Sequence, residues 1–240
     1  MENRDQPGVD NTLVIHYLTL RQLIGILGIL LPVFLIVGSF LTECKHIEAS
    51  ISDFYYTRLR DVFVVTLSAV SLFLFTYKGY DPLDKIMTNL AGVFGLVVAF
   101  FPTTFYPGIC VPCFSIYPSR VPAVLLPCYH GMAVGAIHLT AASLFFITLA
   151  FISFFLFTKV SETGTPTPQK IVRNRIYRIC ACIMIGCILL LVPYFTIATV
   201  KSHLDRYNLV FWMETIALWA FGTSWLIKGE FILKDKPMVA

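Results

Sequence analysis

The feature that most constrains this chain is a set of six apolar stretches of near-membrane length. They cover residues 23–42, 61–77, 86–105, 132–157, 176–200 and 207–227. A helix needs about 20 apolar residues to cross a bilayer core about 30 Å thick. None of the six alternates apolar and polar residues as a barrel strand does, so only helices satisfy the backbone in lipid. We therefore expect an all-α integral membrane protein, built as a six-transmembrane-helix bundle.

The composition supports the same class. Hydrophobic residues make up 57% of the 240 residues and charged residues only 13%. A soluble domain carries about 25% charged residues, and this chain has too few to cover a soluble surface. Disorder is excluded because there is ample apolar surface to bury. The net charge of +4 is mild and gives no reason to expect nucleic acid as a partner. Membrane lipids are the partners that the composition predicts.

The distribution of Lys and Arg predicts the orientation of the bundle. The face that carries both termini has 12 of the 18 basic residues: Arg4, Arg21, Lys78, Lys85, Lys159, Lys170, Arg173, Arg175, Arg178, Lys228, Lys234 and Lys236. The other face has six: Lys45, Arg58, Arg60, Arg120, Lys201 and Arg206. Cytoplasmic loops carry the excess of positive charge, so both termini are predicted to be cytoplasmic in a cell-membrane protein. Residues 1–22 are then a cytoplasmic tail or interfacial segment, residues 23–227 the transmembrane domain, and residues 228–240 a second tail.

The predicted outer face has a long loop and a group of cysteines. The loop covers residues 106–131, is rich in proline and aromatic residues, and is long enough to act as a lid or a binding loop. Four cysteines lie on this face, and in an oxidising compartment they are candidates for disulfides: Cys44, Cys110, Cys113 and Cys128. The Cys110-x-x-Cys113 spacing also fits a redox pair or half of a zinc site.

Ionisable residues inside apolar spans mark the candidate site. At a rise of 1.5 Å per residue, Asp61, His138 and Glu214 lie about 24, 28 and 20 Å from the inner ends of their helices. Three helices thus place an ionisable group in one outer layer, and charges in the membrane indicate function by default. The segment just before Asp61 adds Tyr56 and Arg60, and Arg60 is the predicted ion-pair partner of Glu214. The candidate ligand-binding residues are Tyr56, Arg60, Asp61, His138 and Glu214. The alternative is a hydrogen-bonded network that only fixes helix register.

Several strings resemble known families. They include SISDFYYT from Ser50, RDVFV from Arg60, YKGYD from Tyr77, NLAG from Asn89, and FGTSWLIKG from Phe221. Together they resemble a family of small uncharacterised multi-pass membrane proteins, mostly bacterial, over residues 22–235. A weaker resemblance is to the alkaline ceramidase and progestin/adiponectin receptor superfamily. That resemblance implies a zinc hydrolase site, with Ser52, Asp61 and His138 in catalytic roles and His130 and His138 as metal ligands.

The chain departs from the second resemblance in several ways. It has six predicted helices instead of seven, it has no H-x-x-x-H pair, and Glu214 stands where a C-terminal histidine is wanted. A zinc site would be short of ligands. No nucleotide-binding or G-x-S-x-G motif is present either. Three functions therefore remain open: an outer-facing polar pocket that binds or transports a small solute, proton or lipid headgroup; a hydrolase of lipid amides or esters, zinc-dependent in one version; and a structural or accessory membrane protein without a ligand.

Overall fold

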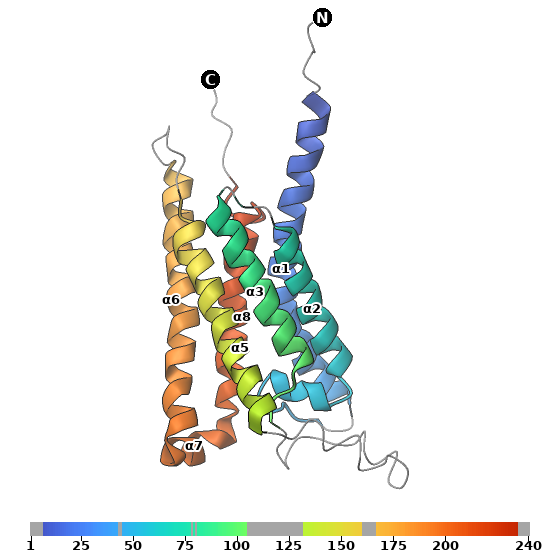
Figure 1. The fold of residues 1–240 in the computed structure, drawn as a ribbon, viewed down its shortest axis with the longest axis vertical. Coiled ribbons are helices and arrows are strands. Elements are labelled where there is room, and N and C mark those ends of the chain that lie inside the picture. Colours follow the sequence, from blue (N-terminus) through green and yellow to red (C-terminus); the bar gives the residue numbers. More distant parts are fainter. Residues whose placement is uncertain are drawn as a thin grey trace, which may run out of the picture.

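The computed structural model describes residues 7–42, 45–77, 79, 81–104, 132–159 and 167–234. Within these ranges six long helices lie side by side (Figure 1): α1 (Pro7–Leu41), α2 (Arg60–Thr76), α3 (Pro82–Phe100), α5 (Met132–Phe151), α6 (Pro168–Thr196) and α8 (Leu209–Lys228). The short elements are the 3₁₀ turn η1 (Ser52–Tyr56), the π-helical turn η3 (Ile152–Leu156), the helix α7 (Ala198–Leu204) and the 3₁₀ turn η4 (Asp205–Tyr207).

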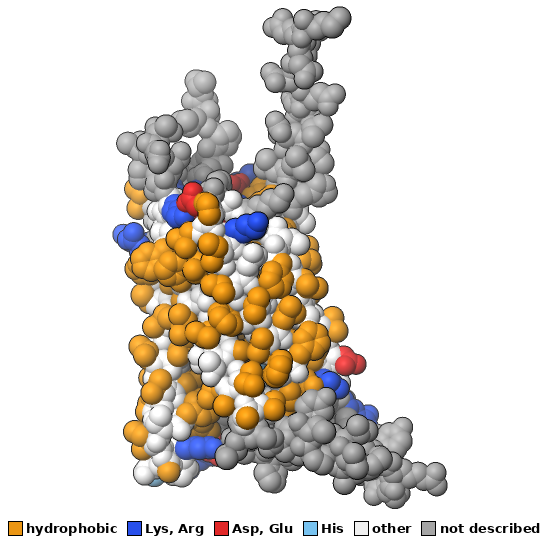
Figure 2. Space-filling model, viewed as in Figure 1, with side chains coloured by type: hydrophobic (Ala, Val, Ile, Leu, Met, Phe, Trp, Pro, Cys, Tyr) orange, Lys and Arg blue, Asp and Glu red, His pale blue; other side chains and the backbone are white. Residues whose placement is uncertain are grey.

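Five of the described helices are long and apolar enough to cross a membrane. These spans are Tyr17–Leu41, Pro82–Phe100, Ala133–Leu156, Pro168–Thr196 and Leu209–Lys228. The predicted span 61–77 corresponds to α2, which has 17 residues and is the shortest of the long helices. The chain is therefore an α-helical, multi-pass membrane protein. On the face drawn in Figure 2, apolar side chains are spread over the middle of the molecule and the charged ones lie near its two ends.

Several predicted boundaries were wrong, and local chemistry explains the differences. Helix α3 ends at Phe100 instead of residue 105, because Pro102 disfavours a helical conformation at the residue before it. Helix α6 begins at Pro168 instead of residue 176. Thr167 caps it by accepting a hydrogen bond from the Lys170 backbone N–H, and proline is favoured in the first helical turn. The same helix ends at Thr196 instead of residue 200, because Ile197 is extended.

The six long helices close into a ring. Each packs between two others, in the order α1, α2, α3, α5, α6, α8 and back to α1. Helix α8 is the most enclosed of the five candidate spans. An aromatic cluster fills the core, where the Trp225 ring lies 5.1 Å from the rings of both Tyr77 and Phe157. The first and last of the described helices, α1 and α8, are therefore direct neighbours.

Two glycines allow α1 and α8 to approach closely. A Cβ added at Gly222 would lie 2.6 Å from the Gly25 carbonyl oxygen, and a Cβ added at Gly25 would lie 2.7 Å from the Gly222 carbonyl oxygen. Both distances are below van der Waals contact, so neither position tolerates a side chain without a shift of the backbone. Small residues commonly serve this purpose where membrane helices meet.

Candidate functional site

The candidate site lies at the η1 end of the bundle, which is the end that contains η1, α7 and the start of α8. The segment 47–51 is held there on α8 by three hydrogen bonds. They join Asn208 Nδ2 to the Ile47 carbonyl (3.1 Å), the Phe211 N–H to the Ala49 carbonyl (2.9 Å), and the Ile51 N–H to Glu214 Oε2 (2.7 Å). The first N–H groups of a helix lack partners within the helix, and the Ala49 carbonyl satisfies one of them. Glu214 thus anchors a loop from inside a transmembrane helix.

The turn η1 follows this segment directly. Ser50 Oγ accepts hydrogen bonds from the backbone N–H groups of Ser52 (3.0 Å) and Asp53 (3.2 Å). These bonds start the turn and bring the side chains of Ser52 and Asp53 into the bundle, where each residue is 5% exposed. Serine is well suited to this role, because its hydroxyl competes with the backbone for local N–H groups.

Ser52 and His138 are in direct hydrogen-bond contact. The distance from Ser52 Oγ to His138 Nε2 is 2.8 Å, and His138 Nδ1 lies 2.6 Å from the Phe101 carbonyl oxygen. A carbonyl oxygen only accepts hydrogen bonds, so in the neutral ring Nδ1 carries the proton and Nε2 has the lone pair. The Ser52 hydroxyl therefore donates to Nε2. A residue on η1 and a residue on α5 are joined in the geometry of a nucleophile and its general base.

A cavity of about 460 Å³ adjoins this pair. Its lining comes from η1, α5, α6, α7, η4, α8 and the segments before η1 and after α3. The polar side chains among the described lining residues are His46, Glu48, Ser50, Ser52, Asp53, Thr103, Thr104, His138, Tyr194, Lys201, Asp205, Asn208 and Glu214. The apolar wall includes Ile47, Leu139, Ala142, Phe195 and Val210. A cavity of this size holds a small organic molecule or the headgroup of a lipid.

Acidic groups outnumber basic ones in the lining. Four carboxyl groups face one lysine, and one of them, Asp205, accepts a 2.6 Å hydrogen bond from the Tyr194 hydroxyl. Burial, with a smaller contribution from the nearby charge of Glu48, raises the pKa of Asp53 to about 7 against the opposing effect of hydrogen bonds with Ser50. The Asp53 carboxyl group therefore titrates near neutral pH, and the net charge of the cavity changes when it does.

The structure brings together only some of the residues chosen from the sequence. Ser52, His138 and Glu214 line the cavity, whereas its described lining does not include Tyr56, Arg60 or Asp61. Tyr56 donates a hydrogen bond to the Thr103 carbonyl (2.5 Å), and burial raises the pKa of its hydroxyl to about 12. Asp61 is exposed on the first turn of α2.

The predicted ion pair between Arg60 and Glu214 was wrong. Arg60 Nη2 donates to the Tyr55 hydroxyl at 2.9 Å, and the guanidinium lies over the same ring, 4.4 Å from its centre. Glu214 uses a backbone N–H as its partner instead. Arg60 begins α2 and is exposed, so its side chain stays on the outside of the bundle.

Some predictions fall outside the described residues. These are the role of His130 as a metal ligand, the loop 106–131, and the disulfide candidates Cys44, Cys110, Cys113 and Cys128. Elsewhere, Cys180, Cys182 and Cys187 are free thiols on α6.

A zinc ion does not fit the described side chains. No group of three or more His, Cys, Asp or Glu residues that could hold a metal is found in the described part of the chain. Both ring nitrogens of His138 are already engaged, one by a backbone carbonyl and the other by Ser52. A structural or catalytic zinc takes at least three protein ligands. The described side chains therefore do not supply the ligands that a zinc-dependent hydrolase needs.

Sequence reasoning missed several residues of the cavity. Glu48 is only 4% exposed although it lies in a loop, and its Oε1 lies 3.6 Å from His46 Nε2. Lys201 and Asp205 come from α7 and η4, which the sequence placed within or beside a transmembrane span. The sequence does carry a signal for the contact between α8 and the segment 47–51. Asn208, Phe211 and Glu214 are spaced by three residues, which places them along one face of a helix, where they can contact the same segment.

Comparisons with family models, with curated proteins and with solved structures find no match for this chain. The fold and the cavity define its class, which is a multi-pass helical membrane protein with a polar cavity at one end of the bundle.

Proposed function

We propose that the cavity at the η1 end binds a small polar ligand, either a solute or a lipid headgroup, that carries a positive charge or several hydrogen-bond donors. The observation that supports this most directly is the lining itself, in which four carboxyl groups face one lysine and two histidines. Carboxylates accept hydrogen bonds and attract cations, so an amine is the group that best complements them. A proton that exchanges at Asp53 is the smallest ligand of this kind.

The proposal includes an orientation for the bundle. With six spans and both termini in the cytoplasm of a cell membrane, the η1 end faces outward. The basic residues support this orientation through their division of 12 against six between the two faces. The cavity would then receive its ligand from the outer medium or from the outer leaflet. Reporter fusions at the two termini test the orientation, and an outer location for either terminus would contradict it.

Thermal unfolding of the purified protein in detergent tests the binding proposal. Choline and ethanolamine, which are both cationic, should raise the melting temperature in a saturable way, whereas glycerol phosphate should not. Glu214→Gln should weaken the effect. Asp61→Asn is the matched control, because it removes an exposed carboxylate at the same end of the bundle that does not line the cavity. Equal effects of cationic and anionic compounds would contradict the proposal.

A second candidate function, the hydrolysis of a lipid amide or ester, is supported by the contact between Ser52 and His138. In this reaction Ser52 Oγ attacks the carbonyl carbon while His138 Nε2 takes its proton. The same nitrogen then protonates the leaving amine or alcohol, and water releases the acyl group from Ser52. The Phe101 carbonyl holds the imidazole in the tautomer that this role requires.

A fluorophosphonate probe tests the second function, because it reacts with activated serine hydroxyls. Labelling should occur at Ser52 and disappear in both Ser52→Ala and His138→Gln. Ser143→Ala is the control, because its hydroxyl lies on the same helix as His138, is bonded to the Leu139 carbonyl, and is outside the Ser52 contact. Absence of any labelling at Ser52 would exclude it as an activated nucleophile and leave binding as the function of the cavity.

A further inference from the structure

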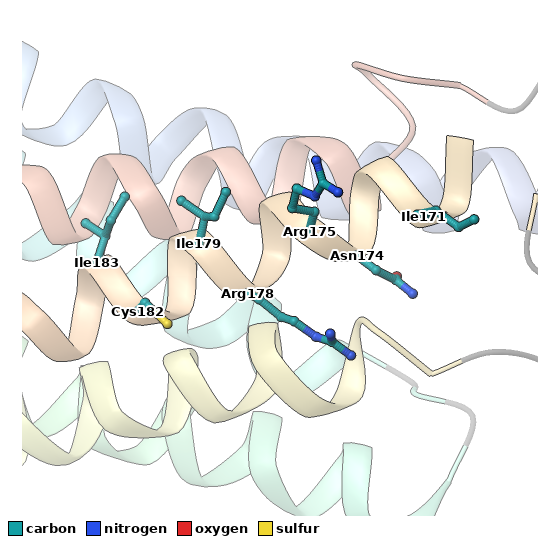
Figure 3. Close-up of a pocket in the computed structure, with 7 residues that line it drawn as sticks. All are labelled: Ile171, Asn174, Arg175, Arg178, Ile179, Cys182 and Ile183. Atoms are coloured by element: carbon teal, nitrogen blue, oxygen red, sulfur yellow. The ribbon is translucent and has the colours of Figure 1, made fainter. Parts of the chain in front are cut away.

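A groove runs along the exposed face of α6 near the opposite end of the bundle, where α8 ends at Lys228. It has a volume of about 660 Å³ and is lined by Ile171, Asn174, Arg175, Arg178, Ile179, Cys182 and Ile183. These positions form two rows along the helix (Figure 3), one with a spacing of four from Ile171 to Ile183 and one from Asn174 to Cys182. Rows with this spacing are the ridges of a helix surface, and the groove lies between them.

Each ridge contributes one arginine, and the two lie about 4.5 Å apart along the helix axis. Arg175 and Arg178 are three residues apart, so their Cβ atoms are neighbours about 5–6 Å apart on the helix surface. Arg178 points toward η3, which continues α5, with its guanidinium 5.8 Å from the centre of the Phe154 ring, whereas Arg175 points to the other side of α6 (Figure 3). Both arginines are exposed, and neither has an ion pair or hydrogen bond to the described residues. Their charges are therefore available to a ligand.

The depth of the arginines matches the headgroup layer of a bilayer. From Ile179 to Thr196, helix α6 has no charged residue. This stretch is about 27 Å long at 1.5 Å per residue, close to the roughly 30 Å of a hydrocarbon core. Arg178 then lies at the edge of the core and Arg175 one step outside it. The apolar part of the groove, formed by Ile179, Cys182 and Ile183, extends inward from that edge.

The local charge favours an anion. Helix α6 has four basic residues in its first three turns, namely Lys170, Arg173, Arg175 and Arg178, and no acidic residue along its length. Arginine donates up to two parallel hydrogen bonds to a phosphate, and anionic lipids attract basic segments at a membrane surface. A second copy of the chain docked by the same face would bring the same arginines against each other, because a two-fold interface is self-complementary. A lipid meets no such repulsion.

We propose that this groove binds an anionic phospholipid. The lipid phosphate lies at the end of the groove that Arg175 and Arg178 flank, where either side chain can turn toward it, and one acyl chain follows the groove past Ile179, Cys182 and Ile183. The site is separate from the cavity at the η1 end and does not depend on the function of that cavity. If the basic face is cytoplasmic, the lipid belongs to the inner leaflet, which is the more anionic one.

The test compares phosphatidylglycerol and phosphatidylcholine with identical acyl chains, added to the purified full chain in detergent. Phosphatidylglycerol should stabilise the protein at lower concentration, with a preference that decreases as salt increases. Each arginine is expected to account for about fivefold in this preference, so Arg175→Gln with Arg178→Gln should reduce it about 25-fold. The control is Arg58→Gln with Arg206→Gln, which removes the same charge at the η1 end and should leave the preference unchanged.

A labelling experiment locates the lipid in the unmodified protein. Phosphatidylglycerol with a photoreactive group in one acyl chain should label the stretch from Ile179 to Ile183. Equal stabilisation by both lipids, labelling confined to other helices, or the same stabilisation by inorganic phosphate would each overturn the proposal. Efficient crosslinking of Cys182 between two copies with a bifunctional maleimide would also overturn it, because the groove would then be an interface between chains.

Discussion

The hydrogen bond from the Ile51 N–H to Glu214 predicts how much unfolding free energy is lost when Glu214 is replaced. Glu214→Ala leaves this N–H without an acceptor, and Ile51 is only 4% exposed. A buried donor that loses its partner costs about 1–3 kcal/mol. The removed side chain faces a cavity, so little packing is lost with it. We expect a total of about 2 kcal/mol, which for a chain of this size lowers the melting temperature by about 4–8 °C.

Glu214→Gln separates the hydrogen bond from the charge. The glutamine amide oxygen still accepts from Ile51, so we expect less than half of the loss caused by Glu214→Ala. Asp61→Ala removes an exposed carboxylate and should change stability by no more than about 0.5 kcal/mol. Thermal unfolding in detergent measures all three variants.

Hydrogen exchange reports on the same bond directly. In the wild type the Ile51 amide should be protected, and in Glu214→Ala its exchange should be about 30-fold faster, the factor that corresponds to about 2 kcal/mol. Glu214→Gln should keep most of the protection. Unchanged exchange in Glu214→Ala, or equal melting temperatures for the Ala and Gln variants, would refute the assignment of Glu214 as the anchor of the segment 47–51.

Three further predictions concern other parts of the bundle. Because burial raises the pKa of Asp53 from its ordinary value of 3.8 to about 7 in the folded protein, the stability linked to this proton is complete below about pH 4, falls as the pH rises toward 7, and is gone above it. The melting temperature should therefore fall between about pH 4 and 7 and level off above that. Asp53→Asn should flatten this slope, and an unchanged slope would assign it to another group. Gly222→Ala should cost about 1–3 kcal/mol by overpacking the contact with α1, whereas Gly186→Ala, which meets nothing within 4 Å, should cost nothing in thermal unfolding. Arg60→Gln and Glu214→Gln should have additive effects in a double-mutant cycle, and a coupling above about 0.5 kcal/mol would mean that they interact.

The sequence was sufficient to place the main elements of the fold and part of the site. Apolar stretches of near-membrane length located the six long helices of the described residues, five of which are long and apolar enough to cross a membrane, because a bilayer imposes both a length and a composition. Counting residues from the inner ends of the helices also put His138 and Glu214 in one layer, and both line the cavity. Ser52 was chosen through the resemblance to a hydrolase superfamily, and the structure places its hydroxyl against His138.

The other features of the site depend on where side chains point, which the depth of a residue in the membrane does not determine. Arg60 was predicted to reach inward, but its side chain lies over the Tyr55 ring, five residues earlier in the chain. Glu48 was overlooked because a loop carboxylate is normally solvated, and its burial depends on how the segment 47–51 lies against α8. Helix α6 begins early because Thr167 caps it and Pro168 is favoured in the first turn. The prediction counted only apolar length, and the first turns of this helix are polar, so this capping signal was not used.

The closed ring has a consequence for how the protein is made. A ribosome releases the helices in sequence order, and domains generally fold as their parts emerge. Helix α1 leaves well before α8, against which it packs, so the seam at Gly25 and Gly222 closes only after Leu209–Lys228 has entered the membrane. The same late helix supplies Glu214, the anchor of the segment that precedes Ser52. A chain truncated before α8 would lack both the seam and the anchor. Its remaining helices could not close into a ring, and we expect membrane quality control to degrade it.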